Sequence, residues 1–174
     1  MNTTSWLFDD LSNPLALDAG TNSDGWYTPS YLIEAARCVL GGIDCDPASC
    51  EAAQSVVQAQ TWYSKAQDGL QQPWTGRVWL NPPYSAPTPW VRRAITSYQA
   101  GDISAALIIT NSYTETAWWQ ELAAVGTMLF FRGRLQFWHP EKETGNNRTG
   151  QTLCYLGRRD ELFRATFARY GVIR

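Results

Sequence analysis

The chain has 174 residues, of which 44% are hydrophobic and 17% charged, and its formal net charge is −2. This length fits one domain of ordinary size, and the composition is that of a globular rather than a disordered protein. The slightly negative charge argues against a protein that holds nucleic acid by bulk charge alone, although a local basic patch remains compatible with it.

The first folded element is expected shortly after a polar amino-terminal stretch. Residues 1–24 predict a loosely ordered leader, so that a single domain covers residues 25–174. Thr28-Pro29 predicts a helix start, with Thr28 or Ser30 as the cap, and apolar side chains at helical spacing follow as far as Val39. Gly41-Gly42 then predicts the end of this helix.

The rest of the chain alternates short apolar runs with amphipathic segments. Strands are predicted at 43–46, 61–64, 77–80, 104–110, 127–132 and 152–156, and helices at 49–60, 90–100, 116–125 and, more weakly, 160–170. This alternation is typical of an α/β fold, with a mainly parallel sheet and helices on both faces. The last two strands follow each other without a helix, so we expect them to form an antiparallel pair at one edge.

The cysteines and the apolar runs limit the cell compartment and the kind of site. The four cysteines show neither a Cys-x-x-Cys pair nor a zinc-ligand spacing, so we expect no metal site and interpret the thiols as reduced and buried. Reduced thiols favour a cytoplasmic protein. No apolar run approaches the length of about 20 residues that spans a membrane, and we expect no membrane partner.

The tetrapeptide Asn81-Pro82-Pro83-Tyr84 directly follows an apolar strand, at the end where ligands bind in open α/β sheets. An asparagine oxygen and the Pro82 carbonyl offer two acceptors for the hydrogens of an aromatic amino group, and their effect grows as charge develops on the nitrogen. The two prolines fix the backbone, and Tyr84 offers a face on which an extruded base can stack. This pattern predicts methylation of an amino group.

A wider set of segments resembles the phage-type DNA N6-adenine methyltransferases of the Dam group, which depend on S-adenosylmethionine. The segments that carry the resemblance are residues 26–29, residues 43–49, Asp68-Gly69-Leu70 with Trp74, the tetrapeptide with Ser85, Trp118-Trp119, and residues 133–137. They occur in the same order as in that group and cover roughly residues 24–157. The resemblance implies a Rossmann-like methyltransferase sheet, a cytoplasmic phage or prophage protein, and transfer of a methyl group to adenine in DNA with base flipping.

The resemblance also implies which residues hold the cofactor. It places Tyr27, Thr28 and Pro29 near its methionine end, and Asp46 and Pro47, with Ala48 and Ser49 after them, at its ammonium. Asp44, two residues before Asp46, is expected on the same face, and Asp68 resembles the acid that bonds the cofactor's adenine; Asn81 adjoins both ligands. A structural strand-end aspartate and an Asp-Gly turn remain open alternatives for Asp44 and Asp68.

Two features depart from the common methyltransferase pattern. Ala48-Ser49-Cys50 stands where many of these enzymes have a glycine-rich turn, and no acid ends the second strand to hold the cofactor ribose, unless Glu51 or Asp68 takes that role. Both departures predict weakened cofactor affinity rather than lost activity, because the tetrapeptide is intact.

DNA contacts are expected from the tetrapeptide and from the polar stretch between the last two strands. Tyr84 and Ser85 are candidates for the first group, and Arg132, Arg134, Phe137, Trp138 and Arg148 for the second. Basic side chains with interleaved aromatics suit phosphate contact and base stacking, and a solvated hairpin connection is the alternative. We expect short or weak sequence recognition by a monomer or homodimer.

Three other functions remain open from the residues alone. RNA adenine and a protein glutamine amide pose the same electronic problem as DNA adenine, although glutamine methyltransferases usually carry a glycine-rich cofactor loop. The chain also fits a binding module of methyltransferase fold that clamps DNA or a protein without catalysis.

Overall fold

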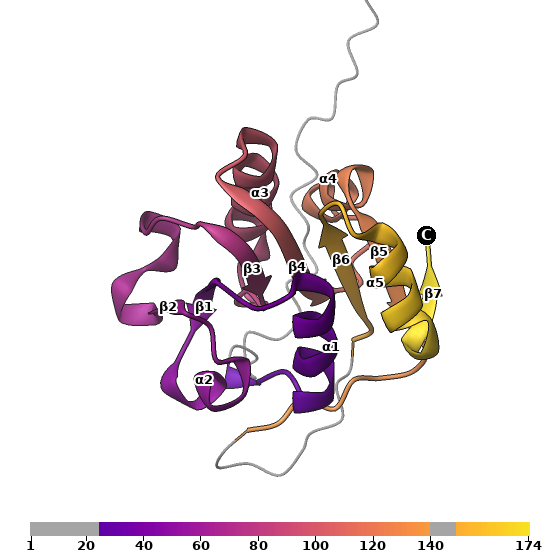
Figure 1. Cartoon of the computed structure of the whole chain (residues 1–174), viewed down its shortest axis with the longest axis horizontal. Coiled ribbons are helices and arrows are strands. Elements are labelled where there is room, and N and C mark those ends of the chain that lie inside the picture. The colour runs from indigo at the N-terminus through magenta and orange to yellow at the C-terminus, as the bar shows by residue number, and fades with distance from the viewer. Residues whose placement is uncertain (1–24, 140–148) are drawn as a thin grey trace, which may run out of the picture.

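The computed structural model describes residues 25–139 and 149–174, which form one seven-stranded sheet with helices on both faces (Figure 1). The strand order is β2-β1-β3-β4-β6-β5-β7. The predicted α/β class, with a parallel centre and antiparallel strands beside it, is thus confirmed. The leader predicted at residues 1–24 lies outside the described residues.

Four neighbouring strands make the parallel half of the sheet. They are β2 (Thr61–Ser64), β1 (Cys45–Ser49), β3 (Gly76–Leu80) and β4 (Ile103–Asn111). β4 is buried at every residue except Ser104, as expected for a parallel strand covered on both faces. Because the carboxyl ends of parallel strands meet at one edge, the residues that follow β1 and β3 become neighbours there.

The other three strands run antiparallel to their neighbours. β6 (Gln151–Leu156) pairs with both β4 and β5 (Thr127–Phe131), and β7 (Gly171–Ile173) pairs with β5. The expected antiparallel pairing of the last two predicted strands is therefore confirmed. Their place in the sheet differs, since β6 is inside it and fully buried, whereas the short β7, which the sequence did not predict, forms the edge.

Within the described residues, five α-helices cover the sheet. α1 (Ser30–Leu40), α2 (Glu51–Val57) and α5 (Asp160–Phe167) pack on one face, and α3 (Pro87–Ala100) and α4 (Ala117–Val125) lie beside each other on the other (Figure 1). Side chains alternate along β3, where Trp79 faces the first core and Val78 and Leu80 face the second. Each face of the sheet thus has its own apolar core.

Several predicted boundaries and environments need correction. The cap of α1 is Pro29 with no side-chain hydrogen bond, in place of the predicted Thr28 or Ser30, and the first strand begins at Cys45 rather than at residue 43. The four cysteines are free, but only two of them, Cys45 and Cys154, are buried. Within the two described ranges, no helix is long and apolar enough to span a membrane, and no cluster of metal-ligating side chains is found.

Gly126 joins α4 to β5 at a point where β6 passes so close that no space is left for a side chain. A Cβ atom there would lie 2.3 Å from the Cys154 sulfur and 2.9 Å from the Tyr155 carbonyl oxygen. Gly126→Ala is therefore expected to lower the free energy of unfolding by about 1–3 kcal/mol, measured by urea denaturation. Gly150→Ala is the control, because its Cβ would meet its nearest neighbour at 3.6 Å. Equal stability of both variants would contradict this packing.

Candidate active site

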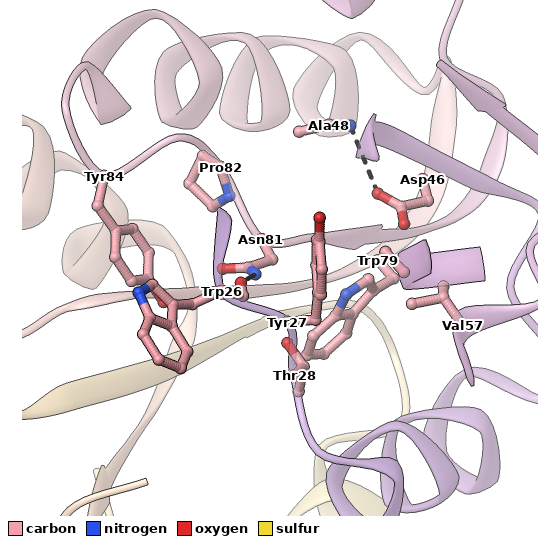
Figure 2. Close-up of a pocket in the computed structure, with 11 residues that line it drawn as sticks. Trp26, Tyr27, Thr28, Asp46, Ala48, Val57, Trp79, Asn81, Pro82 and Tyr84 are labelled. Atoms are coloured by element: carbon pink, nitrogen blue, oxygen red, sulfur yellow. Dashed lines mark hydrogen bonds between the residues drawn. The ribbon is translucent and has the colours of Figure 1, made fainter. Parts of the chain in front are cut away.

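A small pocket, with a cavity volume of about 40 Å³, opens at the carboxyl ends of β1 and β3. Its walls come from the segment before α1, the end of β1, helix α2 and the tetrapeptide after β3; the lining residues are Trp26, Tyr27, Thr28, Asp46, Ala48, Ala53, Val57, Trp79, Asn81, Pro82 and Tyr84. Figure 2 shows Asn81 with Trp26 and Tyr84 on one side and Asp46 with Ala48 on the other. The structure thus brings together two groups of predicted site residues that are far apart in the sequence.

Asn81 is held with one end of its amide fixed and the other end available. Its Nδ2 donates a hydrogen bond to the Trp26 carbonyl oxygen at 3.3 Å, whereas its Oδ1 is buried and has no hydrogen-bond partner. A carbonyl accepts only from the amino end of an amide, so this contact fixes the orientation of the Asn81 amide and leaves Oδ1 as its unpartnered end. The available oxygen is the acceptor that an amino-group substrate requires.

Unpartnered buried polar atoms gather in this pocket. Among the described residues, four buried side-chain oxygen or nitrogen atoms have no hydrogen-bond partner, and three of them belong to the pocket-lining Thr28, Asn81 and Tyr84. A buried polar group without a partner costs about 1–3 kcal/mol, and such groups are uncommon in folded proteins. Their concentration in one pocket indicates a site shaped for a polar ligand.

Asp46 supplies the only carboxyl group in the described lining of the pocket. Its side chain is 2% exposed, and its oxygens accept from the Gln54 amide at 2.8 Å and from the Ala48 backbone N–H at 3.4 Å. Burial raises the pKa of the Asp46 carboxyl to about 7, against the opposing effect of hydrogen bonds from Ser49, Ala48 and Gln54. A cationic ligand group beside Asp46 would favour its ionised form.

Tyr84 lies on the Asn81 side of the pocket. Its ring meets Phe137 edge-on, with ring centroids 6.2 Å apart, and its hydroxyl is buried without a partner. Burial raises the pKa of the Tyr84 phenol far above its ordinary value, so the group is neutral. Pro82 is buried and Pro83 half-buried, and the Pro83 carbonyl accepts from the Ala86 N–H in the turn that follows.

Residues 26–28 are held in place by contacts with Trp138, which lies 110 residues after Thr28 in the sequence. Tyr27 and Trp138 form an antiparallel bridge, and the Trp138 indole donates to the Thr28 carbonyl at 3.1 Å. The Tyr27 hydroxyl also accepts from the Cys50 thiol at 3.1 Å, which links this segment to the start of α2. Tyr27 and Thr28 therefore line the pocket, with Pro29 directly after them.

The Asp68-Gly69 turn lies against the end of β1. A Cβ atom on Gly69 would come within 1.8 Å of the Pro47 carbonyl oxygen, so only glycine allows this approach. Asp68 is exposed, and its side chain accepts from the Leu70 N–H at 3.2 Å, as in the alternative interpretation of an Asp-Gly turn. The turn is near Pro47, but Asp68 does not line the pocket described above.

Asp44 is not brought to this pocket, contrary to the expectation. It precedes β1, at the opposite end of the strand from Ser49, and its carboxylate binds the Arg77 guanidinium at 2.5 and 2.7 Å. The Arg77 contacts hold the pKa of Asp44 below its usual value, although burial acts in the opposite direction. Asp44 therefore fits the alternative interpretation of a structural aspartate at a strand end. We leave Asp44 out of the proposed cofactor site.

Some of the predicted DNA-contacting side chains are exposed, whereas others are buried or half-buried. Arg132 and Arg134 are exposed just after β5, and Ser85 is exposed after the tetrapeptide. Phe137 is only 3% exposed and packs in the core, so the expectation that it contacts DNA is corrected. Trp138 is half-buried with its indole N–H engaged by the protein, and Arg148 lies outside the described residues.

Five contributors to the site were missed from the sequence, and two of them, Ala53 and Val57, line the pocket from α2. Trp26 acts through its backbone carbonyl, Gln54 bonds both Asp46 and Ser49 from α2, and Trp79 forms a wall two residues before Asn81. Only Trp79 carried a usable signal, because alternation along a strand puts it on the same face as Asn81.

Most of the chain matches a known protein family. A family model described as DNA N-6-adenine-methyltransferase (Dam) matches residues 18–166. The chain belongs to this family. It is also 35% identical over 111 residues to a DNA N-6-adenine-methyltransferase of Escherichia phage T1, a match that covers 59% of this chain and 44% of the phage protein. The matched part thus amounts to less than half of that relative.

In this Dam-family protein the buried Asp46 makes stability depend on pH. The folded-state pKa of about 7 exceeds the value of 3.8 for an unperturbed aspartate, so the unfolded chain loses this proton first as the pH rises. The free energy of unfolding is expected to fall by up to about 4 kcal/mol between pH 4 and pH 7 and then to level off.

The asparagine in Asp46→Asn cannot titrate, so the free energy of unfolding of this variant is not expected to fall between pH 4 and pH 7 for this reason. The variant should therefore gain stability relative to the wild type as the pH rises. Urea denaturation of both proteins from pH 4 to pH 8 measures the difference. A difference that stays constant over this range would contradict a buried, ionisable Asp46.

Proposed function

We propose that this chain transfers a methyl group from S-adenosylmethionine to the N6 amino group of adenine in DNA. The observation that carries the proposal is the buried Asn81 Oδ1, an unpartnered acceptor in a pocket, with the other end of its amide fixed by the Trp26 carbonyl. An adenine amino group has two hydrogens to donate and a delocalised lone pair. Acceptors on those hydrogens become more favourable as the nitrogen gains positive charge, which is stabilisation of the transition state.

The tetrapeptide supplies the rest of this half of the site. The Pro83 carbonyl already accepts from the Ala86 N–H, and we propose the Pro82 carbonyl as the second acceptor. Tyr84 would stack against a flipped adenine. For this contact, the adenine has to reach the Tyr84 ring from the pocket that Tyr84 lines. A bound cofactor would supply the methyl group from its sulfonium: the N–CH3 bond would form as the S–CH3 bond breaks, S-adenosylhomocysteine would leave as a neutral thioether, and the extra proton on the nitrogen would pass to solvent.

The other half of the pocket fits the cofactor's amino-acid end. The Asp46 carboxyl is proposed to hold the ammonium group, and because burial raises its pKa to about 7, binding a cation would promote its ionisation near neutral pH. The Thr28 hydroxyl is buried in the lining of the same pocket without a partner and offers a donor for a carboxylate. Tyr27, Pro47, Ala48 and Ser49 complete this side, and Asp68 is proposed to reach the adenine from the adjoining turn.

DNA would approach the same edge of the sheet. Arg132 and Arg134 are exposed after β5, whose carboxyl end points in the same direction as those of β3 and β4, and the Arg134 guanidinium lies near Ser112 and Gly150. Phosphate contacts by exposed arginines position a duplex without reading its sequence. Ser85 adjoins the tetrapeptide on this side.

Incubation with labelled cofactor and DNA, followed by nucleoside analysis, tests the proposal directly. N6-methyladenine in duplex DNA is the expected product. Label in RNA or in protein glutamine instead would identify one of the alternative substrates. Cofactor binding without any transfer, or no cofactor binding by calorimetry, would favour a non-catalytic binding module.

Asn81→Ala is expected to lower kcat by at least about 10²-fold, because it removes an acceptor that acts in the transition state. Radiolabel transfer measures the effect, and urea denaturation checks that the variant is folded. Asn111→Ala is the control, since it removes an amide at the end of the neighbouring strand β4, outside the pocket lining. Near-normal transfer by Asn81→Ala would refute the mechanism.

Tyr84 offers a matched pair of variants for base flipping. Tyr84→Phe keeps the stacking face and removes only an unpartnered hydroxyl, so near-normal activity is expected. Tyr84→Ala loses stacking worth about 1–3 kcal/mol per base and should weaken transfer about 5- to 150-fold. Fluorescence of 2-aminopurine at the target position reports flipping, and equal signals from both variants would argue against stacking on Tyr84.

A further inference from the structure

Trp138 is connected to Asn81 through the segment of residues 26–28. Its backbone N–H donates to the Tyr27 carbonyl at 3.0 Å and its carbonyl accepts from the Tyr27 N–H at 2.9 Å. Its indole N–H donates to the Thr28 carbonyl at 3.1 Å, and its ring lies 5.1 Å from that of Tyr27. These bonds fix the backbone immediately after Trp26, whose carbonyl accepts from Asn81.

The Asn81 amide has two nearly isosteric orientations that differ in which end faces the pocket. With Oδ1 facing the pocket it accepts from an amino group, and with Nδ2 facing the pocket it would repel one, since both would be donors. The Trp26 carbonyl is the partner that distinguishes the two orientations, because it can accept only from Nδ2. Any change that moves this carbonyl weakens the preference for the productive orientation.

We propose that Trp138 is a positioning residue that keeps the Trp26 carbonyl on the Asn81 amide and so holds Oδ1 toward the substrate. This inference rests on the proposed function, in which Asn81 Oδ1 is the acceptor. It assigns to Trp138 a role different from the base stacking or phosphate-side contact expected from the sequence. The half-buried ring and its engaged indole N–H support the positioning role.

The experiment compares Trp138→Phe with Trp119→Phe. The first keeps an aromatic ring and the backbone bridge but removes the hydrogen bond to Thr28. The second also removes one indole hydrogen bond, from Trp119 Nε1 to Thr152 Oγ1 at 3.1 Å, but at a buried place on α4 outside the pocket lining. Both variants lose the same kind of interaction, so only position distinguishes them.

Trp138→Phe is expected to lower kcat about three- to tenfold, the effect of one lost hydrogen bond, with unchanged KM for DNA and unchanged cofactor affinity. Trp119→Phe is expected to keep the wild-type kcat, even if its stability falls. A rise in KM for DNA with unchanged kcat in Trp138→Phe would overturn positioning in favour of a DNA contact. Wild-type kcat and KM in both variants would overturn the inference as well.

A second readout does not depend on activity. In the wild type, the Asn81 side-chain amide protons should exchange slowly with solvent in nitrogen-15 NMR spectra, with the signal assigned by its loss in Asn81→Ala. In Trp138→Phe they should exchange faster, and in Trp119→Phe they should not change. Fast exchange of the Asn81 amide protons in the wild type would overturn the inference, and this result does not depend on whether any variant folds.

The two proposals fail in different ways. If the wild type makes no N6-methyladenine, the proposed function fails, while the amide exchange still reports whether Trp138 controls Asn81. If the wild type methylates DNA and Trp138→Phe matches it in kcat and amide exchange, only the positioning role fails.

Discussion

The hydrogen bond from the Asn81 side chain to the Trp26 carbonyl joins two parts of the chain that are 55 residues apart. It brings the end of β3 and the segment before α1 together in the wall of one pocket, and it determines which end of the Asn81 amide is left without a partner. An amide offers a donor and an acceptor, so occupying one end with the protein defines the chemistry of the other. The acceptor proposed for the substrate amine depends on this single contact.

The sheet topology explains why such a contact forms here. Parallel strands bring the residues after β1 and β3 to the same edge, and the short segment before α1 is held over that edge by its bridge to Trp138. The resulting pocket contains a buried carboxyl and three buried polar atoms without partners. Leaving these groups unsatisfied costs stability, and a polar, cationic ligand would recover that cost on binding.

The sequence predicted the parts of the fold that depend on local patterns. The buried run of β4, the strand before Asn81 and the helices of both faces follow from apolar spacing and turn residues. The position of Asn81 at a strand end, on which the site depends, was predicted for the same reason. β7 was not, because three residues with one glycine give almost no strand signal.

The site itself could be predicted only in part, because its remaining contacts are not local. The Trp26 carbonyl carries no side-chain signal, and Gln54 is connected to Asp46 by the way α2 packs on β1. Asp44 and Asp46 are two residues apart and share a face, but β1 begins at Cys45, so Asp44 meets Arg77 at the other end of the strand. Phe137 alternates with exposed Gln136 and turns into the core.

A crystal structure of the protein with duplex DNA and a non-reactive cofactor analogue tests the central claim most directly. The account predicts a flipped adenine whose amino nitrogen lies within hydrogen-bonding distance of Asn81 Oδ1, while Asn81 Nδ2 still donates to the Trp26 carbonyl. An adenine bound elsewhere, or an Asn81 oxygen turned away from it toward the protein, would contradict the account.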